Sequence, residues 1–192
     1  MGPWTSFEIG ILDAIQKLST PGLDKFMVTI TSLGNLSIIW IAFIIIFLST
    51  KEYKTMGKVM VLGFILNLII VNLLLKNIFT RVRPFNIVNH ADLLIPALKD
   101  GSFPSGHTSY AFTIFTIVLF MAKKKSLKVL TGILAVLIAF SRLYLYVHFP
   151  TDVIGGVIIG FILAILAMKI YFSKNIREKL ANTNLQRRQK VL

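Results

Sequence analysis

The sequence contains no cysteine, which excludes disulfide bonds and thiolate metal sites. Acidic residues are scarce: there are 8 against 21 basic residues, and the formal net charge is +13. In a soluble chain this excess would suggest a nucleic-acid partner. Charged residues are few overall, however, since 55% of the 192 residues are hydrophobic and the mean hydropathy is +0.76. The apolar residues form long runs, so we expect an all-α polytopic membrane protein of one domain, residues 1–192, without nucleic acid.

The sequence also shows little sign of a cleavable secretion signal. The first apolar stretch has no basic leader and is interrupted by Glu8 and Asp13, so we expect the N-terminus to be retained. Residues 4–18 instead place apolar side chains on one face of a helix, and Thr5 with Glu8 resembles a capping box. We predict an amphipathic helix that lies in the membrane interface; packing on the helix bundle is an equal alternative.

Six apolar runs follow, which predict six transmembrane helices. The first two, 21–33 and 36–48, are separated by Gly34-Asn35 and are expected to form a tight helical hairpin, although the first is short for a hydrocarbon core of about 30 Å. The remaining spans are predicted at 56–75, at 105–121, from 129 to 140 and into a polar stretch, and at 152–171. A basic tail, 173–192, closes the chain.

The basic residues also predict an orientation. Two turns, 51–58 and 123–128, together with the chain from Lys169 onward, hold 14 of the 21 basic residues. Basic residues accumulate on the cytoplasmic side of membrane proteins. We therefore expect the turns, the tail and both termini to be cytoplasmic in a plasma-membrane protein, and the opposite ends of the helices to face outward.

Three polar segments share this outward side: Lys76 to Pro84, Pro104 to His107, and Ser141 to Asp152. Each has an ordinary explanation by itself, such as snorkelling cations or a helix start. Within the last segment, however, an arginine, a histidine and an aspartate interrupt membrane-spanning sequence, where one ionisable side chain costs roughly 2.5–3.5 kcal/mol. The combination of the three segments therefore indicates a functional site.

The residue types in these segments suit a phosphoryl group. Lys76, Arg83 and Arg142 supply fixed positive charge, and the two arginines can bind phosphate oxygens in pairs. Ser105 and Gly106 begin a long helix, where free backbone N–H groups favour an anion and glycine permits close approach. We predict that these five residues bind the substrate phosphate.

Two histidines have different neighbours and therefore suit different tasks. His148 lies about one helical turn before Asp152, whose carboxylate can hold one ring nitrogen and leave the other free to attack phosphorus. His107 has no acidic neighbour in sequence and suits the general acid that protonates a leaving oxygen. Asp152 is the only carboxylate in the three motifs, so neither a metal nor another cofactor is expected.

The motifs resemble the three signatures of the type 2 phosphatidic acid phosphatase family, in the superfamily of the vanadium haloperoxidases. They occur in the family's order: Lys76 with Arg83-Pro84, then Pro104-Ser105-Gly106-His107, then Ser141-Arg142 with His148 and Asp152. The resemblance implies that His148 is the nucleophile and forms a phosphohistidine, that Asp152 orients it, and that His107 protonates the leaving oxygen.

Within that family the sequence looks most like the bacterial phosphatidylglycerophosphatases of the B type. The resemblance implies hydrolysis of a lipid phosphate such as phosphatidylglycerophosphate, with activity on phosphatidic acid and isoprenyl diphosphates. Undecaprenyl diphosphate as the main substrate is the first alternative. A vanadate-holding haloperoxidase and a non-enzymatic transporter or scaffold are further alternatives.

Other polar and small residues receive simpler interpretations. Asn72 shares a helical face with Lys76 and either orients it or hydrogen-bonds between helices. Arg81 is expected to guard the site's entrance or to snorkel, and His90 to be solvated. Gly156 and Gly160 form a small-xxx-small pair, which favours close helix packing within the monomer and leaves a homodimer face as an alternative.

Overall fold

A computed structural model describes residues 2–34, 38–88 and 93–189, with side chains up to Ser173. Every regular element in these ranges is a helix, which confirms the all-α prediction. The elements at the end of the bundle are α1 (Pro3–Gln16) and the two short helices α5 (Lys76–Ile78) and α6 (Pro84–Ile87). The other elements are α2 (Pro21–Gly34), α3 (Ile38–Ser49), α4 (Lys54–Asn67), the π-helix η2 (Leu68–Leu75), α7 (Gly106–Met121), α8 (Lys125–Tyr144) and α9 (Pro150–Gln189).

Three helices in the described ranges are long and apolar enough to cross a membrane: Lys54–Ile78, Lys125–Tyr144 and Pro150–Ser173. The pair α2 and α3 adds a fourth if it counts as one bent span, whereas α7 is apolar but shorter. The predicted six spans are therefore not confirmed. The predicted hairpin is wrong, because α3 departs from the direction of α2 by 52° and does not reverse it. The break itself, residues 35–37, lies outside the described residues.

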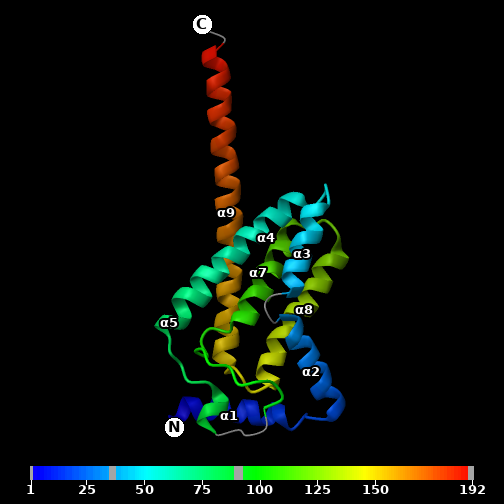
Figure 1. Ribbon diagram of the computed structural model, residues 1–192, viewed down its shortest axis with the longest axis vertical. Coiled ribbons are helices and arrows are strands. Elements are labelled where there is room, and N and C mark those ends of the chain that lie inside the picture. Colours follow the sequence, from blue (N-terminus) through cyan, green and yellow to red (C-terminus); the bar gives the residue numbers. More distant parts are fainter. Residues whose placement is uncertain (1, 35–37, 89–92, 190–192) are drawn as a thin grey trace.

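Counting α2 and α3 as one traverse changes the expected position of the N-terminus. Helix α1 lies across one end of the bundle, and the C-terminal end of α9 projects from the other (Figure 1). The prediction that both termini lie on one side is therefore wrong. The two basic turns, which precede α4 and α8, lie at the end nearer the C-terminus, so the basic regions do share one end. Helix α9 also extends through most of the predicted tail.

Helix α7 is central and packs most extensively on α9. The contact depends on glycine: a Cβ atom at Gly160 would lie 2.6 Å from the carbonyl oxygen of Ser109, and one at Gly156 would lie 2.7 Å from that of Ser105. Packing within the monomer, the favoured interpretation of this glycine pair, therefore explains it. The face predicted as an alternative homodimer surface is covered by α7 and is not free for a second copy.

A buried polar chain links the same helices. The Asn67 amide donates to the Thr113 hydroxyl oxygen at 2.7 Å and accepts from the Ser109 hydroxyl at 2.6 Å, while Thr113 donates to the Gly160 carbonyl at 3.1 Å. In a bundle surrounded by lipid, such hydrogen bonds and close backbone contacts hold helices together without a hydrophobic driving force. They fix the start of α7 against α4 and α9, where the predicted motifs lie.

We predict that Gly160→Ala destabilises the protein by about 1–3 kcal/mol, the usual cost of overpacking a tight contact. Gly10→Ala on α1 is the matched control, because a Cβ at Gly10 meets no atom within 4 Å. Thermal unfolding in detergent, followed by circular dichroism, measures both variants. An unchanged midpoint for Gly160→Ala would contradict the α7–α9 packing.

Candidate active site

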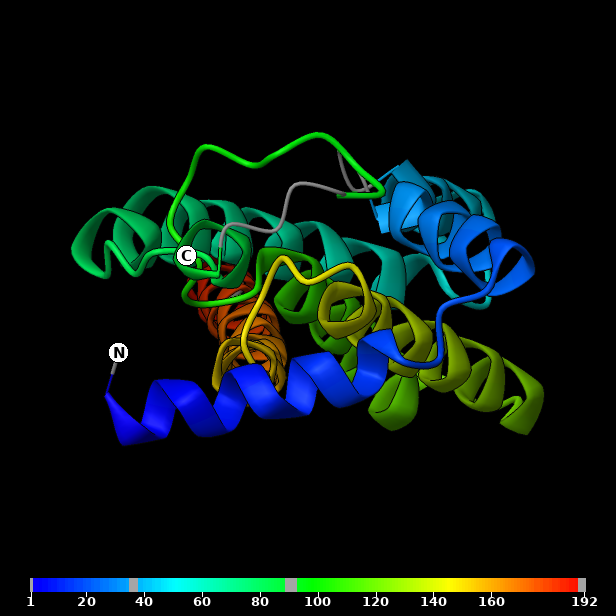
Figure 2. The ribbon, with the colours of Figure 1, turned by 90° about the horizontal axis from the view of Figure 1, so that it is seen from below.

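The predicted site residues lie at the end of the bundle that carries α1. They come from α5 and the segment after it, from the loop before α7 and its first turn, and from the end of α8, the turn 145–149 and the first turn of α9. Figure 2 shows this end, where α1 runs alongside the yellow turn that joins α8 to α9. The Ser105 backbone N–H donates to the Asp152 carbonyl oxygen at 3.0 Å, which ties the second motif to the third.

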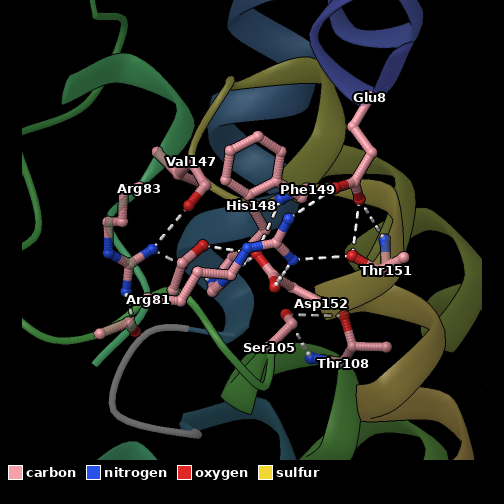
Figure 3. Close-up of polar contacts among 12 residues, drawn as sticks. Glu8, Arg81, Arg83, Ser105, Thr108, Val147, His148, Phe149, Thr151 and Asp152 are labelled. Carbon is pink, nitrogen blue, oxygen red and sulfur yellow. Dashed lines mark hydrogen bonds and ion pairs between the residues drawn. The ribbon is translucent and has the colours of Figure 1, made fainter. Parts of the chain in front are cut away.

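Asp152 is fully buried and lies beside His148, as the four-residue spacing predicts. Its Oδ2 lies 3.7 Å from Nδ1 of His148, slightly beyond hydrogen-bond distance. The same oxygen accepts from the Ser102 hydroxyl and, at 2.8 Å, from the Phe149 N–H. The carboxylate is therefore held from several directions with one oxygen toward the imidazole (Figure 3).

Arg83 fixes the other side of the His148 ring. Its Nη1 donates to the Val147 carbonyl at 2.7 Å and lies 3.3 Å from Nε2 of His148. A guanidinium has only donors, so Nε2 must be the acceptor and the proton of the neutral ring must be on Nδ1, facing Asp152. The geometry leaves the lone pair of His148 on Nε2, the nitrogen turned away from the carboxylate.

Burial lowers the pKa of His148 to about 3, because it removes water from the charged imidazolium. The nearby cations Arg83 and Arg142 lower the pKa further, while Asp152 raises it. His148 is therefore neutral at pH 7, which is the protonation state that a nucleophilic nitrogen requires.

Arg142 is the most unusual cation at the site. It is 1% exposed, and its Nη1 donates to the Thr31 hydroxyl of α2. Its Nε and Nη2 have no hydrogen-bond partner among the described residues. Buried charges in proteins are normally paired. Two unused donors on a buried guanidinium therefore indicate a place for an anion, in agreement with the predicted phosphate role.

Asp100 connects the two cations of the first motif, a contact that sequence spacing could not reveal. Its carboxylate accepts from Lys76 and, at 2.8 Å, from Nη2 of Arg83. Burial opposes ionisation of Asp100, but the hydrogen bonds and charges of the two cations outweigh it and lower the pKa to about 2. Asp100 is thus an internal anion on Lys76 and Arg83, two residues predicted to bind phosphate.

The second motif begins α7 as predicted. The Ser105 hydroxyl caps the helix, at 3.4 Å from the Thr108 N–H and 2.8 Å from the Thr108 hydroxyl. A Cβ at Gly106 would lie 3.4 Å from the Asn72 side chain and 4.0 Å from Nζ of Lys76, so these residues are neighbours. The predicted contact of Ser105 with phosphate competes with this capping role and stays a prediction.

His107 and Lys76 line one open cavity of about 710 Å³. Its wall is polar near Asp100 and apolar along the helices, where Phe64 and Leu68 contribute. His107 interacts electrostatically with His148 and Arg142, so the two predicted histidines belong to one cluster. The structure therefore brings together all eight residues predicted for the site. His90 lies outside the described residues.

Arg81 differs from its predicted role. It neither guards an entrance nor snorkels, because its guanidinium pairs with Asp152 at 2.7 Å and with Glu8 of α1. In the sequence, Glu8 interrupts the first apolar stretch and resembles part of a capping box, and neither feature predicts this contact. No local pattern links residues so distant along the chain, and the contact becomes visible only in the folded protein.

Comparison with known proteins agrees with this geometry. A family model described as the PAP2 superfamily matches residues 57–176. The chain belongs to the PAP2 superfamily. The predicted resemblance is thus confirmed, and the matched region includes all three motifs.

Two similar proteins are named for different lipid phosphates. An undecaprenyl-diphosphatase from Sulfolobus acidocaldarius is 31% identical over 164 residues, which cover 85% of this chain and 78% of the relative. Phosphatidylglycerophosphatase B from Bacillus subtilis is 33% identical over 173 residues, which cover 84% and 81%.

Two crystal structures share the PAP2 fold of this chain. LpxE from Aquifex aeolicus has a TM-score of 0.72 and 34% identity, with 83% of this chain and 93% of LpxE covered. The PAP2-type phosphatidylglycerolphosphate phosphatase from Bacillus subtilis has a TM-score of 0.68 and 31% identity, with 93% and 88% covered. The chain is therefore a membrane protein of the PAP2 lipid phosphatase family.

We predict that buried His148 makes stability depend on pH. Its ordinary pKa of 6.5 falls to about 3 on folding. Below pH 6.5 the unfolded chain binds a proton that the folded protein does not. The free energy of unfolding therefore decreases as the pH is lowered, by up to about 1.4 kcal/mol per pH unit. His148→Asn removes this contribution. Denaturant titrations in detergent at several pH values between about 4 and 7 give the free energy of unfolding at each pH. This free energy should change less steeply with pH in the variant than in the wild-type protein, and an equal dependence on pH would contradict the assignment.

Proposed function

We propose that the protein hydrolyses the phosphomonoester of phosphatidylglycerophosphate to phosphatidylglycerol, through a phosphohistidine on His148. The proposal rests chiefly on the buried guanidinium of Arg142, whose Nε and Nη2 have no partner among the described residues and which lies in the same cluster as two imidazoles. The similarity to phosphatidylglycerophosphatase B supports the choice of lipid. We infer that the whole chain, 1–192, acts as one membrane-embedded domain.

In this reaction Nε2 of neutral His148 attacks phosphorus, and a P–N bond forms as the P–O bond to the lipid breaks. His107, in its protonated form, gives its proton to the leaving oxygen. Asp152 stabilises the positive charge that develops on the His148 ring. Water then attacks phosphorus, His107 takes the proton of that water, and the P–N bond breaks to release inorganic phosphate.

Positive groups hold the phosphate oxygens through both steps. Arg142 offers its two free donors, and Arg83 already contacts the reacting nitrogen. Lys76 lies near Gly106, where the first turn of α7 presents backbone N–H groups. A phosphate that reaches Lys76 replaces the carboxylate of Asp100, so Asp100 competes with the substrate for the same cations.

The cavity suggests how a lipid is accommodated. Its polar part lies at Lys76, His107 and Asp100, and its apolar part lies along Phe64 and Leu68 of the long helix that crosses the bundle obliquely (Figure 1). A head group in the polar part would leave the acyl chains beside the lipid-facing helices. We infer that the site faces outward in the plasma membrane, because the basic turns lie at the opposite end of the bundle.

Undecaprenyl diphosphate as the main substrate is the second candidate. The relative from Sulfolobus acidocaldarius is named an undecaprenyl-diphosphatase, and this similarity favours it. A diphosphate carries more negative charge, and the site offers three cations, Lys76, Arg83 and Arg142. Phosphatidic acid is a further substrate of the same chemical class.

We predict that His148→Ala abolishes phosphate release from lipid phosphates, because the variant lacks Nε2, the nitrogen that forms the bond to phosphorus. The assay uses purified protein in detergent with phosphatidylglycerophosphate, phosphatidic acid and undecaprenyl diphosphate. His90→Ala, outside the three motifs, is the control and should retain wild-type rates. Near-normal turnover by His148→Ala would exclude the nucleophile, and an inactive wild-type protein on every lipid would favour a transporter or scaffold.

We also predict that turnover persists in excess chelator, because fixed cations of the protein perform the charge neutralisation that a divalent metal performs elsewhere. Phosphate release is compared with and without EDTA after extensive dialysis. Loss of activity that added Mg²⁺ or Zn²⁺ restores would overturn the metal-free mechanism.

A further inference from the structure

We propose that Glu8 and Arg81 are positioning residues that connect helix α1 to the nucleophile pair. The inference rests on the proposed function and deepens it. It assigns to α1 a part in the reaction, although α1 lies outside residues 57–176, the region matched by the family model.

Arg81 bridges α1 and the catalytic aspartate. Its Nη1 donates to Oδ1 of Asp152 and to the Thr151 hydroxyl, both at 2.7 Å, while its Nη2 pairs with Glu8. The guanidinium also lies 4.0 Å over the ring of Phe149, a cation–π contact that fixes its plane. Oδ1 of Asp152 is thus held by Arg81, while Oδ2 faces His148 (Figure 3).

Glu8 is buried and hydrogen-bonded, although it belongs to a helix at the surface of the bundle. Its side chain is 1% exposed, and its Oε1 accepts from the Thr151 N–H at 3.1 Å and from the Thr151 hydroxyl at 2.6 Å. Its other oxygen accepts from Arg81. A buried carboxylate with both oxygens occupied balances the charge of Arg81, so that Asp152 does not have to neutralise this cation alone.

Two more polar contacts join α1 to the same turn. Asp13 accepts from the Tyr146 hydroxyl at 2.7 Å, and the Gln16 amide donates to the Tyr144 carbonyl at 2.5 Å. Tyr146 has a φ of 59°, a left-handed conformation that is uncommon for a residue other than glycine. Strained backbone persists only where its surroundings fix it. The contacts of α1 with Tyr144, Tyr146 and Thr151 therefore hold the turn that carries His148 and the residues on both sides of it.

A role of α1 confined to the membrane is the competing explanation. Its outer face exposes Trp4 and Phe7, and the exposed Leu18 follows its end, which suits the lipid interface that the sequence predicts. The two roles use different side chains of α1, since Glu8 is buried whereas Trp4 and Phe7 are exposed, and they can be separated by mutation. Arg81 contacts Asp152, and Glu8 contacts Thr151.

The test compares Glu8→Gln, Glu8→Asp, Arg81→Met and the double variant Glu8→Gln/Arg81→Met. Glu8→Gln keeps the shape of the side chain and removes the charge, whereas Glu8→Asp keeps the charge. We expect Glu8→Gln and Arg81→Met each to lower kcat roughly tenfold or more, the effect of losing one charged hydrogen bond. KM should change little, because neither side chain touches the phosphate cations. Glu8→Asp should recover part of the rate.

The double variant distinguishes a shared role from two separate ones. Residues that act through one contact are not additive, so the double variant should be little slower than Arg81→Met alone. Trp4→Ala/Phe7→Ala is the matched control on the outer face of α1, and we expect it to keep the wild-type kcat in detergent. Size-exclusion chromatography and thermal unfolding verify that each variant is folded.

Each other outcome overturns the positioning role. Wild-type kcat in Glu8→Gln would show that Asp152 needs no help from α1. A raised KM with unchanged kcat would assign α1 to substrate binding. Unfolding of every Glu8 and Arg81 variant, Glu8→Asp included, would reduce the pair to fold stability. If the wild-type protein releases phosphate from no lipid, the proposed function fails instead, a result that is separate from all three.

Discussion

The buried guanidinium of Arg142 is the constraint on which this site depends. A cation that is 1% exposed needs a counter-charge, yet two of its nitrogens have no partner in the described part of the chain. An anion that fills this position completes the electrostatic balance of the bundle end. Thr31 of α2 holds the third nitrogen, so the scaffold fixes the direction of the unused donors.

Charge at this end is arranged in two layers. The inner layer is cationic: Arg83 and Arg142 act on His148, and Lys76 lies beside Gly106 at the start of α7. The outer layer is anionic: Asp100 balances Lys76 and Arg83, and Glu8 balances Arg81 behind Asp152. The outer anions let several cations gather in a small volume without unpaired repulsion, while burial and the cations Arg83 and Arg142 keep His148 neutral.

Sequence reasoning found the site better than it found the fold. The three motifs were visible because charged side chains interrupt apolar runs, and their residues meet in the structure. The bend between α2 and α3 was not visible, because two short apolar runs with Gly34-Asn35 between them fit a hairpin as well as one bent span. That single error moved the predicted N-terminus to the wrong end. Asp100 and Glu8 were missed because no local spacing joins them to their partners.

The most direct test is a structure of the detergent-solubilised protein with orthovanadate, a phosphate analogue, bound at the site. The account predicts one anion within hydrogen-bond distance of Nε and Nη2 of Arg142, with a vanadium–nitrogen bond to Nε2 of His148 and His107 on the opposite side. An anion held elsewhere, with the Arg142 donors still unpaired, would contradict it.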